Sequence, residues 1–196
     1  MSVYDMFTVP LVHYRIADWQ HNKQRILNAL PELNEEHLKS NGDVYTDFFE
    51  WYAEPDLPPY ADTVIDIIKP YLADFTDQRR VEFTDMWFQS SFNGNGHSLH
   101  NHGHSGWSSV IYVEFNPKVH TPTRFISPFN NFWNGNLEDY MPEVQEGDMV
   151  IFPSTIAHEA EVNKSNVKRT IVSYNLRGKV DKVKRSMWQG DPVVYR

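Results

Sequence analysis

The sequence predicts a mainly β protein with flanking helices, in the form of a sandwich or jelly roll. From about residue 79 onward, many short apolar runs are separated by Gly, Pro and Asn, which is typical of such folds. Residues 1–78 instead contain apolar residues at helical spacing. A chain of 196 residues is long enough for one core. We therefore expect a single domain with a helical flank (1–78), a β core (79–178) and a C-terminal tail (179–196).

The two helices of the flank are predicted from apolar spacing and from signals at their ends. Asp18 is placed to cap a helix that contains Trp19 and Ile26 and ends at Pro31. The second helix is predicted from five apolar residues at helical spacing, namely Val64, Ile67, Ile68, Tyr71 and Leu72.

The strands of the β core are predicted from short apolar or alternating runs. They are expected at about residues 81–92, 109–115, 124–127, 149–152, 160–162 and 169–176. Residues 130–142 are rich in aromatic residues and Asn, and we expect them to form an insertion near the mouth of the site.

A histidine tract at residues 97–104 contains four of the nine histidines of the chain. Because alternate residues of a strand point to the same face, His100 and His102 can direct two imidazoles toward one point. A third histidine, His158, follows a predicted turn and buried strand. Imidazole is a common protein ligand of Zn, Fe, Cu and Ni. The spacing therefore predicts an open metal site built from two strands, as in a metalloenzyme.

An arginine begins the last predicted strand. Its odd positions place Arg169 on the same face as Ile171, Ser173 and Asn175, opposite Val172, Tyr174 and Leu176. A lone arginine on the polar side of a half-buried strand is unusual unless it meets an anion. The planar guanidinium suits a carboxylate bound through two hydrogen bonds.

These residues resemble a known family. The motifs are His100-x-His102-x-His104-Ser105-x-x-Ser108-x-Val110-x-Tyr112-Val113, then Gly147-Asp148-x-Val150-x-Phe152-Pro153-Ser154-x-x-x-His158, then Arg169, Ser173 and Asn175. Together they are similar to the Fe(II)- and 2-oxoglutarate-dependent oxygenases, in the prolyl-4-hydroxylase-like branch found in bacteria and bacteriophages. The resemblance covers residues 83–177 and implies a double-stranded β-helix, the cupin-like form of the jelly roll.

The resemblance also assigns residues to roles. It implies that His100 and His158 bind iron and that Arg169 binds the far carboxylate of 2-oxoglutarate. His102 stands where the superfamily usually has a carboxylate, and we assign it as the remaining ligand. Tyr112 is expected to add a hydroxyl to the same carboxylate. The other residues expected at the cosubstrate are Gln89, Ser173 and Asn175.

The implied activity is that of a dioxygenase. Fe(II), 2-oxoglutarate and O2 would together hydroxylate an unidentified substrate, with no catalytic residue beyond the metal ligands. By family analogy alone, a prolyl or other peptidyl residue is the leading substrate class.

Other readings of the same residues stay open. His104 forms a second His-x-His pair with His102, and Glu159 is an acid beside His158, so either residue could supply the third ligand. An all-imidazole site would also hold Zn or Cu well. A non-catalytic metal-binding β-sandwich, cupin-like or lectin-like, would not need Arg169. A hydrolytic zinc enzyme would need a general base, for which Glu159 is the obvious neighbour.

Composition excludes several classes of protein. The formal net charge of −8 disfavours nucleic-acid binding. No apolar run reaches the roughly 20 residues of a membrane span, and residues 1–22 lack the features of a signal peptide. Because the chain has no cysteine, we expect a cytoplasmic location. The sequence does not indicate the oligomeric state.

Overall fold

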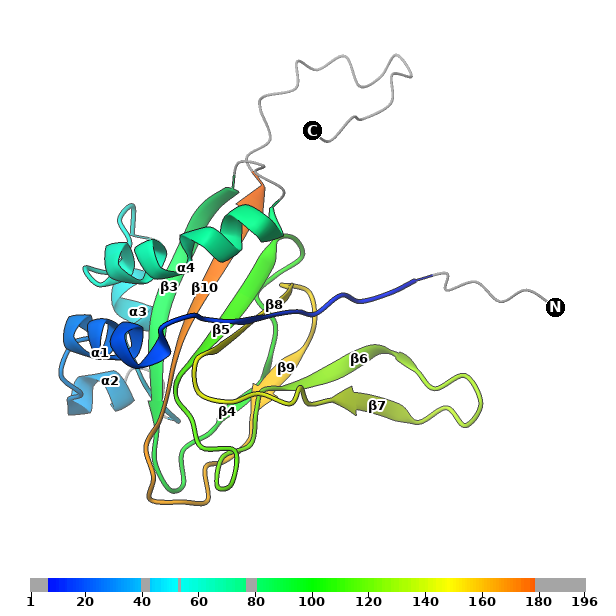
Figure 1. Ribbon diagram of the computed structural model, residues 1–196. Helices are drawn as coiled ribbons and strands as arrows, with labels where there is room; N and C mark the ends of the chain where they lie inside the picture. The colour runs from blue at the N-terminus through cyan, green and yellow to red at the C-terminus, as the bar shows by residue number, and fades with distance from the viewer. Residues whose placement is uncertain (1–6, 40–42, 53, 77–80, 179–196) are drawn as a thin grey trace, which may run out of the picture.

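The secondary structure is described here from a computed structural model, for residues 7–39, 43–52, 54–76 and 81–178 (Figure 1). The helices are α1 (Trp19–Ala29), α2 (Glu35–Lys39), α3 (Phe48–Trp51) and α4 (Ala61–Phe75). The strands are β1 (Val12–Arg15), β2 (Tyr45–Thr46), β3 (Val81–Ser91), β4 (His97–His100), β5 (Trp107–Glu114), β6 (Arg124–Asn130), β7 (Leu137–Tyr140), β8 (Asp148–Pro153), β9 (His158–Ala160) and β10 (Arg169–Gly178). The expected tail, 179–196, lies outside the described residues.

The strands form two antiparallel sheets. The larger sheet has the order β1-β8-β5-β10-β3-β2, and the smaller has the order β4-β9-β6-β7. Strands distant in sequence are neighbours in both sheets, for example β10 between β3 and β5. This arrangement confirms the predicted mainly β class.

The two faces of the larger sheet carry different packing. Along β10, Val172 and Tyr174 belong to the core shared with α1 and α4, whereas Ile171 belongs to a second core. Along β5, Val110 joins Ile171 in that second core with Phe125 of the smaller sheet. The helices therefore cover one face, and the other face looks toward the smaller sheet. The alternation predicted for residues 169–176 is confirmed, and it directs Arg169 away from the helices.

Several predicted elements differ from those observed. The strand expected at 160–162 is β9, which begins at His158 because it pairs with β4. Strands β1, β2 and β7 and the short helices α2 and α3 were not predicted, whereas the strand expected through His100 and His102 is β4, which ends at His100. Asp18 stands at the N-cap of α1, but its backbone is left-handed and its side chain makes no capping hydrogen bond. Asp18 therefore occupies the predicted N-cap position, but the prediction that its side chain caps the helix is wrong.

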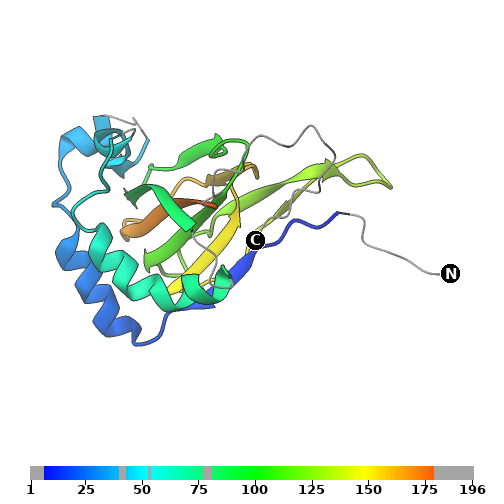
Figure 2. The ribbon, with the colours of Figure 1, turned by 90° about the horizontal axis from the view of Figure 1, so that it is seen from above.

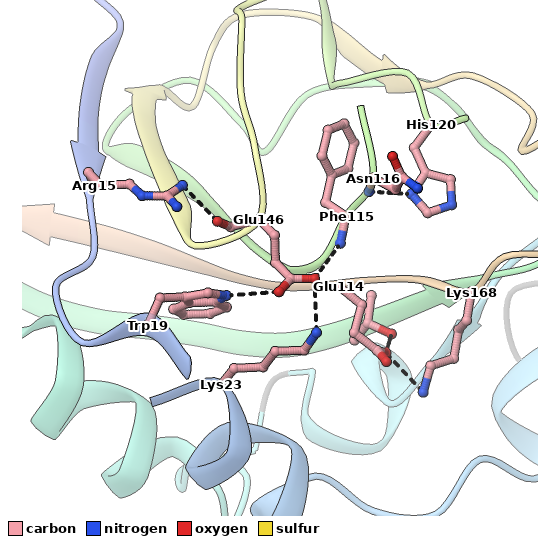
Figure 3. Close-up of polar contacts among 10 residues, drawn as sticks. Arg15, Trp19, Lys23, Glu114, Phe115, Asn116, His120, Glu146 and Lys168 are labelled. Carbon is pink, nitrogen blue, oxygen red and sulfur yellow. Dashed lines mark hydrogen bonds and ion pairs between the residues drawn. The ribbon is translucent and has the colours of Figure 1, made fainter. Parts of the chain in front are cut away.

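Glu146, in the loop before β8, links this loop to helix α1 through hydrogen bonds (Figure 3). The Glu146 carboxylate accepts hydrogen bonds from the Trp19 indole N–H (3.2 Å), the Lys23 ammonium (2.9 Å) and the backbone N–H of Phe115 (3.4 Å). The next residue, Gly147, has φ +89°, and a Cβ there would lie 2.6 Å from the Trp19 ring. Glycine at this turn therefore allows Trp19 to pack closely against the backbone.

The expected insertion at residues 130–142 is the turn and second strand of the β6–β7 hairpin. The hairpin projects from the body on the side opposite the helices (Figures 1 and 2). At its tip Phe132 and Trp133 are 92% and 98% exposed. Within the described part of the chain, no helix is both long and apolar enough to cross a membrane.

Candidate metal and cosubstrate site

Three histidines gather where β4 meets β9. The pairing of these strands sets His100 opposite His158, with ring centroids 4.4 Å apart. His102 lies two residues beyond the end of β4, and its backbone N–H donates to the carbonyl of Ser154 (2.9 Å). One nitrogen from each of the three rings lies within 4.8 Å of the others. The expected convergence is therefore present. His102 reaches it through the Ser154 contact, because the strand that was expected to carry it ends at His100.

Each of these three rings is held in the same tautomer. The Nδ1 atoms face oxygens that can only accept, namely Ser98 O at 2.7 Å from His100, Ile156 O at 3.0 Å from His158 and Asn175 Oδ1 at 2.8 Å from His102. Nδ1 must therefore carry the proton, which leaves the lone pair of Nε2 for a metal.

Burial also keeps the rings neutral. Desolvation, with a smaller contribution from neighbouring histidines, lowers the pKa of His158 to about 3. Desolvation likewise lowers the pKa of His102 to about 4 and shifts that of His100 downward. Metal ligation requires neutral imidazole, so the site has ligands in the required state at neutral pH.

A hydrogen-bonded relay orients His102. The Asn175 amide accepts from His102 through Oδ1 and donates through Nδ2 to Asp85 Oδ2 (3.1 Å). Asp85 Oδ2 also accepts from the Thr84 hydroxyl (2.8 Å). Because a carboxylate can only accept, Asp85 fixes which way the Asn175 amide points. Asn175, expected at the cosubstrate, therefore contacts a histidine of the cluster and does not line the cavity described next.

Arg169 is buried beside the histidine cluster and forms no ion pair with any residue that the structure describes. The residue is only 5% exposed. Within the same part of the chain its Nε and Nη2 atoms have no hydrogen-bond partner, although the group lies over the Tyr112 ring at 5.8 Å. Desolvation lowers the pKa of the guanidinium. Nε and Nη2 form one edge of the planar group, which suits a carboxylate bound through two hydrogen bonds.

One cavity joins this edge of Arg169 to the histidines. Its lining residues are Trp87, Gln89, His97, His100, His102, Val110, Thr123, His158, Glu159, Ala160, Arg169, Ile171 and Ser173. Arg169, Ser173 and Gln89, which were expected at the cosubstrate, therefore line the same cavity as the histidines. A buried, unpaired cation in the same cavity as three unprotonated imidazole nitrogens fits a ligand that is both a metal chelator and a carboxylate.

Tyr112 has a different environment from the one expected. The ring is fully buried, and its hydroxyl donates to Thr123 Oγ1 (3.0 Å) and accepts from Thr123 N (3.1 Å). Tyr112 does not line the cavity, whereas Thr123 does. Thr123, which the sequence analysis did not single out, therefore lines the cavity where Tyr112 was expected.

His97 was also missed, although it belongs to the histidine tract. Its ring lies 4.0 Å from that of His100, and its Nδ1 faces the Gln89 amide nitrogen at 2.9 Å. Since that amide nitrogen can only donate, His97 Nδ1 must accept and Nε2 must carry the proton. This tautomer is opposite to that of the other three histidines, so His97 serves as a hydrogen-bond donor in the cavity wall and not as a ligand.

Neither alternative ligand belongs to the cluster of three histidines, although Glu159 lines the same cavity. His104 is exposed and does not belong to the cluster. The Glu159 carboxylate pairs with Arg124 Nη1 (2.9 Å), and Glu159 is likewise outside the cluster. Among the described residues, the metal-ligating groups at this point are the three histidines.

The core of the chain matches a family model. Residues 85–175 match the 2OG-Fe(II) oxygenase family, and this span includes the three histidines and Arg169. The match covers just under half of the 196-residue chain and supports the 2OG-Fe(II) oxygenase superfamily. On this match the chain is assigned as an oxidoreductase whose cofactors are Fe(II) and 2-oxoglutarate, in preference to a non-catalytic sandwich or a zinc hydrolase.

Solved structures agree on the fold. The viral collagen prolyl hydroxylase of Paramecium Bursaria Chlorella virus-1, in complex with 2OG, matches with TM-score 0.55 and 12% identity over 87% of this chain and 96% of that one. A Pseudomonas putida prolyl-4-hydroxylase matches with TM-score 0.51 and 12% identity over 88% and 94%. The epimerase SnoN, in complex with Fe3+, alpha ketoglutarate and nogalamycin RO, matches with TM-score 0.56 and 10% identity over 86% and 78%. No curated protein sequence matches the chain. The likeness confirms the double-stranded β-helix.

Proposed function

We propose that His100, His102 and His158 hold Fe(II) through Nε2 and that Arg169 binds the distal carboxylate of 2-oxoglutarate. When bound, iron and 2-oxoglutarate supply O2 activation coupled to decarboxylation to succinate. Three neutral ligands leave the metal charge at +2, which dianionic 2-oxoglutarate neutralises. The observation that carries this proposal is the unpaired guanidinium edge in the histidine cavity, because a buried cation without a partner is costly unless a ligand pairs with it.

The residues of the cavity have distinct tasks in this proposal. Arg169 and the Thr123 hydroxyl orient the cosubstrate, and Gln89 and Ser173 line its path to the metal. The protonated Nε2 of His97 offers a donor to an oxygen of the bound ligands. Asn175 and Asp85 keep the Nε2 of His102 directed at the metal. The role of the protein is thus to position the reacting groups, and the oxidative chemistry belongs to the cofactors.

We further propose that the reaction is a hydroxylation. A prolyl or other peptidyl residue is one candidate substrate, because two structural neighbours are prolyl hydroxylases. A neighbour that is an epimerase has the same fold, so the fold alone leaves the reaction type open.

An anaerobic titration tests this proposal. Addition of 2-oxoglutarate to the Fe(II)-loaded protein should produce a visible charge-transfer band, and admission of air should release succinate. Zn(II)-loaded protein is the control and should give neither signal. Absence of both the band and succinate with Fe(II) would contradict the proposal.

A further inference from the structure

A second, larger cleft opens on the other side of the histidine cluster. It shares Trp87, Gln89, His97, His100 and His102 with the cosubstrate cavity. The residues that line it in addition are Phe48, Phe49, Tyr52, Thr84, Asp85, Asn101, Gly103, Asn175 and Arg177. A molecule in this cleft would therefore lie next to the metal ligands without displacing the cosubstrate.

One wall of the cleft is aromatic. Phe48 of α3 contacts the rings of Tyr52 and Trp87, each with centroids 5.1 Å apart, and Trp87 in turn contacts His102 at 5.2 Å. Phe49 and Tyr52 are 54% and 59% exposed although they are large. The rings form a continuous path from solvent to the metal site, which suits an apolar side chain.

An acidic residue, Asp85, also lines the cleft beside Asn175. The β3–β10 register passes from Asn175↔Asp85 to Leu176↔Phe83, so Thr84 is an extra residue and both Thr84 and Asp85 line the cleft. Both hydrogen bonds to Asp85 go to Oδ2, and no described residue donates to Oδ1. This bulge therefore presents one carboxylate oxygen to a ligand.

A positively charged residue, Arg177, lines the cleft as well. Arg177 is exposed and lines the cleft two residues beyond Asn175 on β10. Within the described residues it forms no ion pair, with Asp85 or with any other acid. Opposite charges that line one cleft without pairing are complementary to a ligand that carries both an ammonium and a carboxylate.

We propose that this cleft binds the primary substrate as an apolar amino acid with free ammonium and carboxylate groups. Asp85 would receive the ammonium and Arg177 the carboxylate, and the side chain would extend along Phe48 and Trp87 toward the histidines. The inference rests on the proposed function, because it places the oxidised carbon beside iron held by that cluster.

Binding to the Fe(II)- and 2-oxoglutarate-loaded protein under nitrogen tests the inference. The probes are L-leucine, L-phenylalanine and L-proline, followed by calorimetry and by the shift of the charge-transfer band. At least one should bind, and N-acetylation or amidation should each weaken binding about tenfold or more, since each removes a charged hydrogen bond. Equal or tighter binding of the N-acetyl amide would indicate a residue within a polypeptide and overturn the inference.

Variants then assign each end of the ligand. Asp85→Asn should abolish the advantage of the free ammonium over the N-acetyl form, and Arg177→Gln should abolish that of the free carboxylate over the amide. Because Asp85 also orients Asn175, which contacts His102, the iron and 2-oxoglutarate affinities of Asp85→Asn are measured first, and the free and N-acetyl forms are then compared on the same cofactor-loaded protein. Asp62→Asn and Arg25→Gln, outside the cleft, are the matched controls. If both cleft variants retain the parent preferences, the assignment is wrong.

Two matched substitutions, one in the cleft and one outside it, test the contribution of the aromatic wall to binding. Phe49→Ala should weaken binding of the apolar probes, whereas Phe132→Ala, at the hairpin tip, should not. Iron and 2-oxoglutarate affinities are measured on the same samples. If both cofactors bind and none of the three amino acids does, this inference fails and the proposed function stands. If the cofactors themselves do not bind, the proposed function fails and this inference with it.

Discussion

Two charged side chains of the molecule, Glu146 and Arg169, differ in the hydrogen-bond partners that the protein gives them. At the base of α1, the Glu146 carboxylate receives hydrogen bonds from Trp19, Lys23 and Phe115 (Figure 3). In the cavity between the sheets, the guanidinium of Arg169 is more deeply buried and has two nitrogens without a partner. The first arrangement is complete within the protein and fastens a helix. The second has no partner among the described residues, and under the proposed function the distal carboxylate of 2-oxoglutarate would supply it.

The largest expected effect is the loss of metal binding when one histidine of the cluster in this cavity is removed. His158→Ala and His102→Ala should each abolish stoichiometric Fe(II) binding, because each removes one of three ligands, while the fold persists. His104→Ala is the control, since this exposed residue lies outside the cluster. Metal content measured after gel filtration checks this. Loss of iron in His104→Ala with retention in His102→Ala would shift the ligand assignment by two residues.

A smaller loss of metal affinity is expected when the support of His102 is removed. Asn175→Leu takes away one acceptor of the His102 Nδ1 proton and leaves the Ser108 hydroxyl as the other. Contacts of this kind typically contribute about 10- to 100-fold to metal affinity, and the lower end of this range is expected here. Competition with a chelator gives the affinity, and the ligand-field spectrum of the Co(II)-loaded protein reports the altered geometry. An unchanged spectrum and affinity would show that the relay has no influence on the metal.

The two charged regions should respond to the same substitution with opposite signs. Glu146→Leu leaves the Trp19 indole and the Phe115 N–H without an acceptor and should lower the free energy of unfolding by about 1 to 3 kcal/mol. Arg169→Leu removes an unpaired buried cation and should raise the stability of the cofactor-free protein by about 1 kcal/mol or more. Urea unfolding of both variants checks this. Destabilisation of the cofactor-free protein by Arg169→Leu would mean that the arginine has a structural role.

Asp47 is an intermediate case between the two regions. It is buried and accepts from the Tyr60 hydroxyl (2.8 Å) and the Phe88 N–H (3.0 Å), but it has no cation beside it. Burial raises its pKa to about 6 despite these hydrogen bonds. A carboxyl with a raised pKa stabilises the fold while it is protonated, so this contribution is complete below about pH 4 and is lost as the pH rises through about 6.

Asp47→Asn should therefore flatten the dependence of stability on pH between 4 and 6. At pH 7.5 the variant should be more stable than the parent by on the order of 2 kcal/mol, since one pKa unit corresponds to about 1.4 kcal/mol and the amide fits less well. Thermal unfolding at several pH values gives the comparison. Parallel curves for the two proteins would show that Asp47 is not the titrating group.

Local patterns in the sequence were enough to predict part of the candidate site. The alternation of residues 169–176 placed Arg169 on the polar face, and the histidine spacing identified the cluster. The partners that complete the site could not be predicted, because His102 and Asn175 are 73 residues apart and Asn175 and Asp85 are 90 apart. For the same reason Thr123 could not be recognised in place of Tyr112. Strand β7 and helix α3 have only four residues each, too few for a periodicity to be detected.

Calorimetric titration of 2-oxoglutarate into the anaerobic Fe(II)-loaded protein tests most directly whether Arg169 is a binding charge. The parent should bind one equivalent, and Arg169→Leu should weaken binding by roughly two orders of magnitude, as is typical when a buried charge pair is broken. Arg169→Lys should recover part of the loss, since an ammonium cannot offer two parallel donors. 2-Oxobutyrate, which lacks the distal carboxylate, should bind the parent and Arg169→Leu equally. Failure of the parent to bind 2-oxoglutarate, or equal affinity in Arg169→Leu, would contradict the assignment.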